Sequence, residues 1–159
     1  MAVNTAKVEG RRKLKFASYE ELLADVDRLT AAPVKSLGNW SPGQIFRHLA
    51  RAYNSSIDGF TMTFPLPMRV LGRLFRKKLL TMQMPAGIKL PASGAKALFP
   101  PETSTEEGAA ELRDAISRLQ REPARVPHPA LGTLTREEWD KVHLSHANLH
   151  LSFLIPNDG

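Results

Sequence analysis

The stretch Thr135-Arg-Glu-Glu-Trp-Asp-Lys-Val-His143-Leu-Ser-His146-Ala-Asn-Leu-His150 opens with a helix signal and carries three of the five histidines. Thr135 and the Glu three residues later fit the capping box, in which two side chains satisfy backbone N–H groups in the first turn of a helix. The apolar residues that follow recur at helical spacing; they are Trp139, Val142, Leu149 and Phe153. The stretch therefore predicts a helix that ends before Pro156.

Three further stretches begin with the same signal: Ser18 with Glu21, Ser41 with Gln44, and Ser104 with Glu107. Apolar residues at helical spacing follow each of them. The first stretch ends before Pro33, the second runs towards Phe60, and the third stops at Pro123. Because no comparable run alternates with period two, the sequence predicts an all-α fold without strands.

The connection over residues 61–103 holds six of the twelve prolines. A connection this long usually contains structure of its own, and Met68 to Leu80 predicts a short extra helix within it. A long crossover frees the helices it joins from being antiparallel neighbours, whereas the short links at 32–40 and 122–134 favour hairpins. The expected architecture is an up-down-down-up four-helix bundle over residues 16–156, behind a basic N-terminal arm (residues 1–15) that need not be ordered.

The amino-acid composition limits the metal ligands and nucleophiles that the protein can offer. The chain of 159 residues has no cysteine, which excludes disulfides, thiolate metal ligands and a cysteine nucleophile. A metal must then be held by histidines and carboxylates, and thiol chemistry must use an external thiol. No stretch has the apolar length of a membrane span or a signal peptide, so a cytoplasmic protein is expected.

The net charge of +6 has two concentrated sources, Arg11–Lys15 and Arg73–Lys78. No nucleic-acid motif accompanies them, and their basic residues are not interleaved with a series of exposed aromatic side chains, as a stacking platform would require. Either run could bind phosphates or anionic lipid, but both are interpreted as solvated surface. Nucleic acid is therefore not an expected partner, and a small-molecule ligand is.

Three histidines share one face of the last predicted helix. At 100° per residue His143, His146 and His150 lie within about 60° of one another, and burying three imidazoles is costly unless each finds a hydrogen-bond partner or a metal. His146 and His150 have the four-residue spacing that aims two imidazoles at one point. His48, on the second helix, is the obvious third metal ligand.

The remaining polar candidates are assigned less directly. Gln44 and Ser55 share the helix edge of His48 and are expected to line a polar cavity. His143 is left open between an accessory cavity group and a hydrogen-bonded core residue. His128, in a proline-rich loop, is interpreted as a packing and turn residue.

Two segments carry a family resemblance. Leu37-Gly-Asn-Trp-Ser-Pro-Gly-Gln-Ile-Phe-Arg-His48-Leu resembles the W-[ST]-x-x-[QE]-x-x-x-H-L motif of DinB/YfiT-like proteins. His128-Pro-Ala-Leu-Gly-Thr-Leu-Thr-Arg-Glu-Glu-Trp139, with the three histidines after it, resembles their closing motif. The similarity extends from about Arg11 to Pro156 and is to a bacterial branch of unknown function. It implies a four-helix bundle that holds a divalent metal through His48, His146 and His150.

The resemblance also implies a chemistry, because characterised relatives include transferases and isomerases that use low-molecular-weight thiols. Several relatives end the motif with His-His-x-x-Gln, where this chain has Leu149-His150-Leu-Ser-Phe153, so one His and one Gln are missing.

Three neutral imidazoles leave a coordination position open, as in catalytic zinc sites, and the nitrogen donors also suit nickel, iron or cobalt. A metal-dependent transferase using an external thiol and a hydrolase are both compatible with such a site. The alternative is a non-catalytic module that binds a metal or a small molecule. A homodimer would be compatible with this alternative. Whether the protein is an enzyme stays open, because the glutamate of the H-E-x-x-H motif is missing between the histidines.

Overall fold

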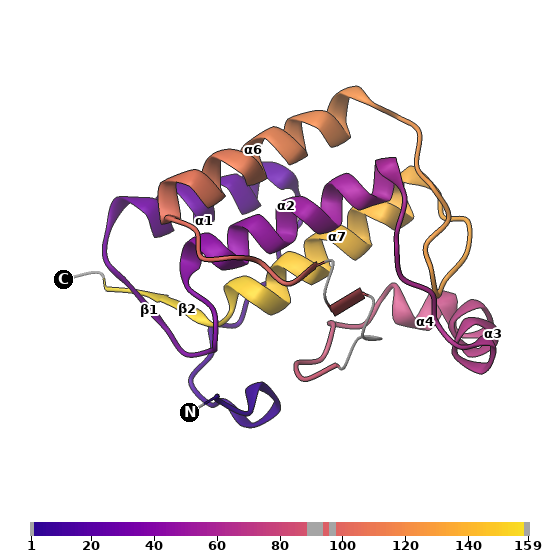
Figure 1. Cartoon of the computed structure of the whole chain (residues 1–159), viewed down its shortest axis with the longest axis horizontal. Helices are drawn as coiled ribbons and strands as arrows, with labels where there is room; N and C mark the ends of the chain where they lie inside the picture. Colours follow the sequence, from indigo (N-terminus) through magenta and orange to yellow (C-terminus); the bar gives the residue numbers. More distant parts are fainter. Residues whose placement is uncertain (1, 89–93, 96–97, 158–159) are drawn as a thin grey trace.

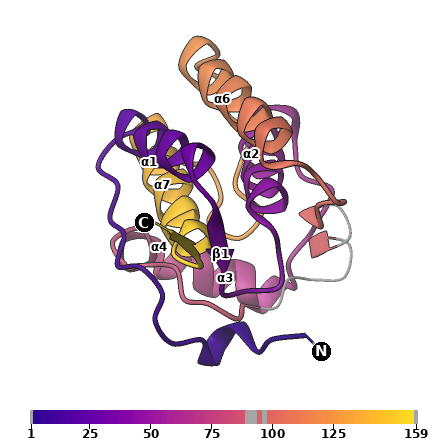
Figure 2. The same cartoon turned by 90° about the vertical axis from the view of Figure 1, so that its left-hand side faces the viewer.

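The regular structure of the protein is predominantly helical, as predicted. The computed structural model describes residues 2–88, 94–95 and 98–157. Four long helices form its body: α1 (Tyr19–Ala31), α2 (Pro42–Asp58), α6 (Thr105–Arg121) and α7 (Arg136–Leu151). Helices α6 and α7 each pack against both α1 and α2, and the contact between α2 and α6 is the most extensive (Figures 1 and 2). Most of their buried apolar side chains form one core, which includes Leu22, Phe46, Tyr53, Leu112 and Leu151, while Trp139 of α7 belongs to a second, smaller cluster.

The four predicted N-caps are confirmed. Ser18, Ser41, Ser104 and Thr135 each accept a hydrogen bond from the backbone N–H three residues later, at 3.2–3.3 Å. The reciprocal half of the capping box is present only at α2 and α7. At α6 the Glu107 carboxylate instead pairs with Arg47 of α2, 3.1 Å away. An N-cap of this kind stabilises a helix by about 1 kcal/mol.

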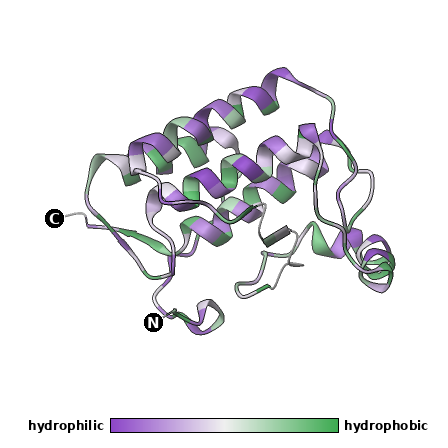
Figure 3. Ribbon diagram, in the orientation of Figure 1, coloured by the Kyte–Doolittle hydropathy of each residue, from purple (hydrophilic) through white to green (hydrophobic). Residues whose placement is uncertain are grey.

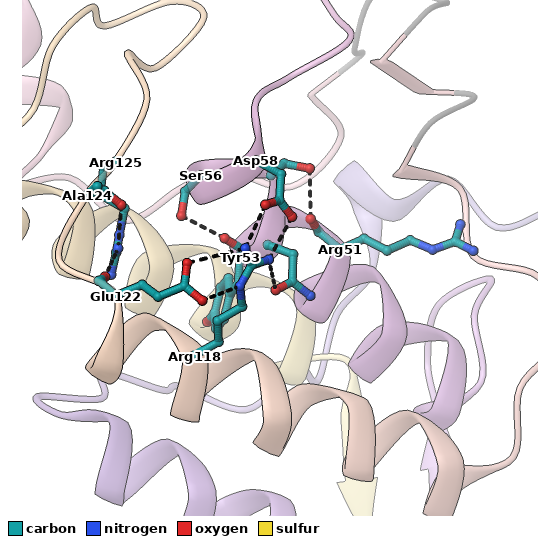
Figure 4. Close-up of polar contacts among 10 residues, drawn as sticks. Arg51, Tyr53, Ser56, Asp58, Arg118, Glu122, Ala124 and Arg125 are labelled. Carbon is teal, nitrogen blue, oxygen red and sulfur yellow. Dashed lines mark hydrogen bonds and ion pairs between the residues drawn. The ribbon is translucent and has the colours of Figure 1, made fainter.

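Helix directions follow from side-chain pairs between the helices. Arg47 near the start of α2 contacts Glu111 of α6, while Asp58 at the end of α2 pairs with Arg118 near the end of α6, 2.6 Å away. These two helices therefore run in the same direction. Figure 4 shows Arg118 held between Asp58 and Glu122, so the end of α2 is fixed on α6 by an ion-pair network.

A two-stranded antiparallel sheet corrects the expectation of a fold without strands. β1 (Val34–Ser36) follows α1, and β2 (Leu154–Pro156) follows α7, with Lys35 opposite Ile155. Each strand has only three residues, too few for an alternating pattern to stand out in the sequence. The sheet joins the ends of α1 and α7 at one edge of the molecule (Figure 1).

The crossover after α2 contains α3 (Leu66–Leu74) and α4 (Arg76–Leu79). The single helix predicted from Met68 to Leu80 is therefore divided, and the break lies at Phe75, which adopts φ −98° and ψ 12°. Both helices lie outside the four long ones (Figure 1). In the part of the chain that the structure describes, no helix is long and apolar enough to cross a membrane.

The N-terminal segment packs against the helices. It begins with the 3-10 helix η1 (Thr5–Lys7), and the Arg12 guanidinium then makes a bidentate ion pair with Asp25 of α1 at 2.7 Å. The Arg12 backbone N–H also donates to the Ser152 carbonyl. The boundary between an arm and a bundle domain at residues 15 and 16 stays a prediction.

Candidate metal centre

Three imidazoles from two helices meet inside the molecule. His48 lies on α2 and is buried, while His146 and His150 lie one turn apart on α7 and are half-buried. One ring nitrogen from each of the three lies within 4.8 Å of the other two, so the group could hold a metal ion. Trp40, just before α2, stacks on His150 at 5.6 Å between ring centroids and also contacts His48 at 4.8 Å.

Hydrogen bonding assigns the tautomer of His48. Its Nδ1 lies 2.8 Å from the Leu98 carbonyl oxygen, so Nδ1 carries the proton and donates. The Nε2 lone pair then faces Nε2 of His146, 3.1 Å away. Two such nitrogens at this distance need a shared proton or a common cation between them. A carbonyl that orients the second ring nitrogen is also the usual outer partner of a metal-ligating histidine.

The spacing of the nitrogens is close to what a metal requires. Zinc bonds imidazole nitrogen at about 2.0–2.1 Å, so two nitrogens on one tetrahedral ion lie about 3.3 Å apart. The Nε2 atoms of His48 and His146 are already near that separation at 3.1 Å. The third nitrogen lies within 4.8 Å of the other two.

Burial keeps all three imidazoles neutral at neutral pH. It lowers the pKa of His48 below the ordinary value of 6.5, aided by the charge of Arg51. It lowers the pKa of His146 and His150 well below that value, and repulsion by neighbouring imidazoles adds to the effect. Their lone pairs are therefore available for coordination without loss of a proton.

The three histidines open onto a cavity of about 810 Å³. Side chains from the crossover close part of it, including Met62, Phe64, Met84 and Ile88. None of the described residues that line the cavity carries a carboxylate, an ammonium or a guanidinium group. A ligand held there would meet mainly apolar surface plus the imidazoles, which suits an uncharged apolar body with one metal-binding atom.

His143 lines the same cavity but lies outside the three-histidine group. Its Nε2 is 3.2 Å from the Ser56 hydroxyl, and that hydroxyl donates to the Tyr53 carbonyl (Figure 4), so His143 Nε2–H must donate to Ser56. The Tyr53 hydroxyl donates to the His143 carbonyl at 2.8 Å. Burial lowers the pKa of His143 to about 3. The residue is thus a neutral, hydrogen-bonded side chain at the cavity wall, and an accessory role for it stays a prediction.

His128 stabilises a turn and also lines the cavity. Its Nδ1 accepts the backbone N–H groups of Ala130 and Leu131, each at 3.1 Å, which fixes the loop before α7. Burial lowers its pKa to about 4. Its ring also contacts Trp139 at 5.4 Å and lines the cavity.

Gln44 and Ser55, the other two residues expected at the cavity, lie in different surroundings. Gln44 lines the cavity, where its side-chain N–H donates to the Pro100 carbonyl at 3.3 Å. Ser55 is not among the residues that line this cavity. Its hydroxyl donates to the carbonyl of Arg51 one turn earlier, so it serves its own helix.

The acidic residues nearest to the histidines in the sequence are engaged elsewhere. Glu138 completes the cap of α7 and lies 3.5 Å from Arg76, while Asp140 accepts the Tyr19 hydroxyl at 2.8 Å. Neither lines the cavity. In the described part of the chain, the centre therefore has no carboxylate beside it to act as a general base.

Sequence reasoning missed three contributors to the centre. Trp40 was part of the quoted motif, and its place directly before a helix that carries His48 was a usable signal. The Leu98 carbonyl had no signal, because any residue can supply one. The crossover wall also had none, since its apolar residues are not periodic.

Comparison with known families gives one match. The model of a family described as a protein of unknown function, DUF1569, matches residues 8–157, and the match includes the three histidines and the helices that carry them. No curated protein and no solved structure matches the chain. Because the family model covers nearly the whole chain, the protein belongs to the DUF1569 family of proteins of unknown function.

Proposed function

We propose that the protein binds a divalent metal ion through His48, His146 and His150. The observation that carries this proposal is the approach of three neutral imidazole nitrogens to within 4.8 Å at the wall of a large cavity. The outer hydrogen bond of His48 to Leu98 supports it, because that bond leaves the inner nitrogen free to coordinate.

We further propose that the fold is an up-down-down-up four-helix bundle of the DinB type. The parallel pairing of α2 with α6 supports this topology. So does the antiparallel pairing of α2 with α7, in which His48 approaches His146 and the later Ser56 approaches the earlier His143. Bundle cores of this kind commonly house metal sites between facing helices.

Zinc or nickel is the proposed ion, with iron or cobalt as alternatives, since the site offers only imidazole donors. When bound, such an ion supplies Lewis acidity at an open coordination position and lowers the pKa of a coordinated thiol or water. The chain itself contributes orientation, because Leu98 and Trp40 fix the imidazoles. The apolar cavity wall excludes water from the ligand body.

The uncharged cavity favours one chemistry over another. A hydrolase would need a base to manage protons, and the described lining residues include no carboxylate. A transferase that uses an external low-molecular-weight thiol needs less from the protein, because a coordinated thiol is readily deprotonated. We therefore place thiol-dependent transfer to an apolar small molecule ahead of hydrolysis.

A second candidate is a non-catalytic module that binds a metal or a small molecule. The same lack of charged groups in the described lining favours it, since no residue there is suited to proton transfer except neutral imidazoles held by hydrogen bonds. A cytoplasmic location and a homodimer stay predictions under either candidate.

Metal content tests the centre. The protein purified without chelator should contain close to one equivalent of metal by elemental analysis, and His146→Ala should contain almost none. His143→Gln is the matched control, because it changes a buried histidine on the same helix and keeps a donor for Ser56. Equal metal in wild type and His146→Ala, or failure of chelator-treated wild type to bind zinc in calorimetry, would refute the assignment.

Cobalt substitution separates the two candidates. Titrating the cobalt-loaded protein with a low-molecular-weight thiol should give a thiolate-to-cobalt charge-transfer band if an external thiol occupies the open position. A spectrum unchanged by thiol would discard the transferase and leave the binding module.

A further inference from the structure

The crossover presents an apolar helix face to solvent. Six large apolar side chains of α3 and the residue after it are about half exposed or more: Leu66, Met68, Val70, Leu71, Leu74 and Phe75. Leu66, Val70 and Leu74 share one face of the helix. Leu74 and Leu66 are exposed to 72% and 68%, the highest values among the large apolar side chains of the described residues. In Figure 3 this corner of the molecule, at the lower right, combines strongly hydrophobic and strongly hydrophilic residues.

One close contact places α3 against the loop before α7. Gly72 is buried, and a Cβ at that position would lie 2.6 Å from the Ala130 carbonyl oxygen, so only glycine permits this approach. Val70 and Leu74 lie about 160° round the helix from Gly72. The helix therefore packs on the protein through its smallest residue and turns its apolar face away from the core.

The same segment holds the positive charge of the molecule. Residues 59–101 contain seven lysines and arginines and no aspartate or glutamate, so the rest of the chain is almost neutral with fifteen basic and sixteen acidic residues. Of the described basic residues, Arg73 on α3 and Lys77 and Lys78 on α4, which follows α3 directly in the sequence, are exposed. Arg76 instead fixes the start of α4, since it donates to the Thr133 carbonyl at 3.0 Å.

We propose that α3 and α4 bind the surface of a membrane that contains anionic lipids. A helix in a bilayer interface inserts its apolar face and keeps lysine and arginine at its edges, where they reach the phosphates. Leu66, Val70 and Leu74 form the inserting face, and Arg73, Lys77 and Lys78 form the basic edge. The contact is peripheral, because α3 has only nine residues.

The positive charge of this segment favours an anionic membrane over a second copy of the chain as its partner. Two copies joined through this face would bring their basic residues together, and in the described part of the crossover no acidic residue is present to offset them. An anionic bilayer instead offers both apolar depth and opposite charge. Attraction to such a surface is worth about fivefold in affinity for each basic residue near it.

Flotation with lipid vesicles tests the proposal. The full chain should bind vesicles of phosphatidylcholine mixed with phosphatidylserine, bind phosphatidylcholine vesicles much less, and lose binding as salt is raised. The double variant Lys77→Glu/Lys78→Glu should bind the mixed vesicles about 25-fold more weakly or worse. The double variant Leu66→Ser/Leu74→Ser should lose binding while it keeps its helical circular dichroism, since both side chains are largely exposed.

The matched control is Lys13→Glu/Lys15→Glu, which makes the same change of net charge at two exposed lysines of the N-terminal segment. Its binding should stay within about twofold of wild type. Equal loss in this control would reduce the effect to net charge and overturn the proposal. Equal binding to both vesicle types would overturn it too. So would self-association that Leu66→Ser/Leu74→Ser abolishes without any vesicle binding, since the face would then belong to a second copy.

Discussion

Acid should destabilise the metal-free protein through His143, and the size of the effect follows from its surroundings. Its Nε2–H donates to Ser56, and its ring lies against Tyr53 and Trp139 with centroids 4.4 and 5.2 Å away. These contacts bury the ring and lower its pKa to about 3. In the unfolded chain the same imidazole has an ordinary pKa of about 6.5.

The unfolded state therefore binds more protons than the folded state between these two pKa values. Stability due to neutral His143 is fully present above pH ~6.5 and is lost progressively as the pH falls towards 3. A pH of 5 lies about 1.5 units below the pKa of His143 in the unfolded chain and above its pKa in the folded chain. Protonation at this pH therefore stabilises only the unfolded state. At 1.36 kcal/mol per unit this amounts to about 2 kcal/mol.

Urea unfolding in the presence of a chelator, followed by tryptophan fluorescence at pH 7 and pH 5, measures the effect. The loss of unfolding free energy between these pH values should be about 2 kcal/mol smaller in His143→Gln than in wild type. Ser56→Ala is the control, because it removes the hydrogen-bond partner but keeps the titrating group. It should lower stability at pH 7 by about 1–3 kcal/mol and retain the full pH dependence. Equal pH dependence in His143→Gln and wild type would refute the reasoning.

Three further predictions concern the metal and the packing. Burial lowers the pKa of the three clustered histidines. Zinc binding measured by calorimetry should therefore persist somewhat below pH 6.5 and weaken only at lower pH, where protons compete with the metal for the ring nitrogens. A sharp loss of zinc affinity at pH 6.5 would contradict this prediction. Gly43→Ala should lower the free energy of unfolding in urea by about 1–3 kcal/mol or more, since its Cβ would collide with the Ser104 carbonyl of the neighbouring helix start; an unchanged unfolding midpoint would exclude this close contact. Arg12→Met should cost about 2 kcal/mol in the same assay, because it removes two hydrogen bonds to the charged, partly buried Asp25. Arg113→Met, which breaks an exposed pair, should cost less than about 1 kcal/mol.

Local signals in the sequence predicted the helices well, because the chemistry of a helix start is local. Ser41 and Thr135 reach backbone groups only three residues away, so the pattern alone places the first turn. The pairing of Val34 with Pro156 depends instead on the ends of α1 and α7 meeting across most of the chain. The three residues of either strand contain no sequence signal that identifies the other strand as its partner.

The crossover shows a different limit. Its apolar residues divide between side chains such as Met62 and Met84, which line the cavity, and others such as Leu74, which face solvent. Met62 and Met84 lie outside α3, whereas Leu74 lies on the side of α3 opposite Gly72, which packs against Ala130. Sequence reasoning could mark a short helix here, but it could not tell which side of that helix would be covered.

The histidines of α7 show how tertiary partners decide the role of identical side chains. His143 and His146 lie on one stripe of the helix, and both are strongly desolvated. Because α2 runs antiparallel to α7, it presents the Ser56 hydroxyl to the first and the His48 imidazole to the second. The hydroxyl accepts a hydrogen bond from His143, whereas the imidazole brings a second ring nitrogen close to His146, in the group that could hold a metal ion. Spacing along α7 limits which histidines can act together, and the residue on the facing helix determines which of them do.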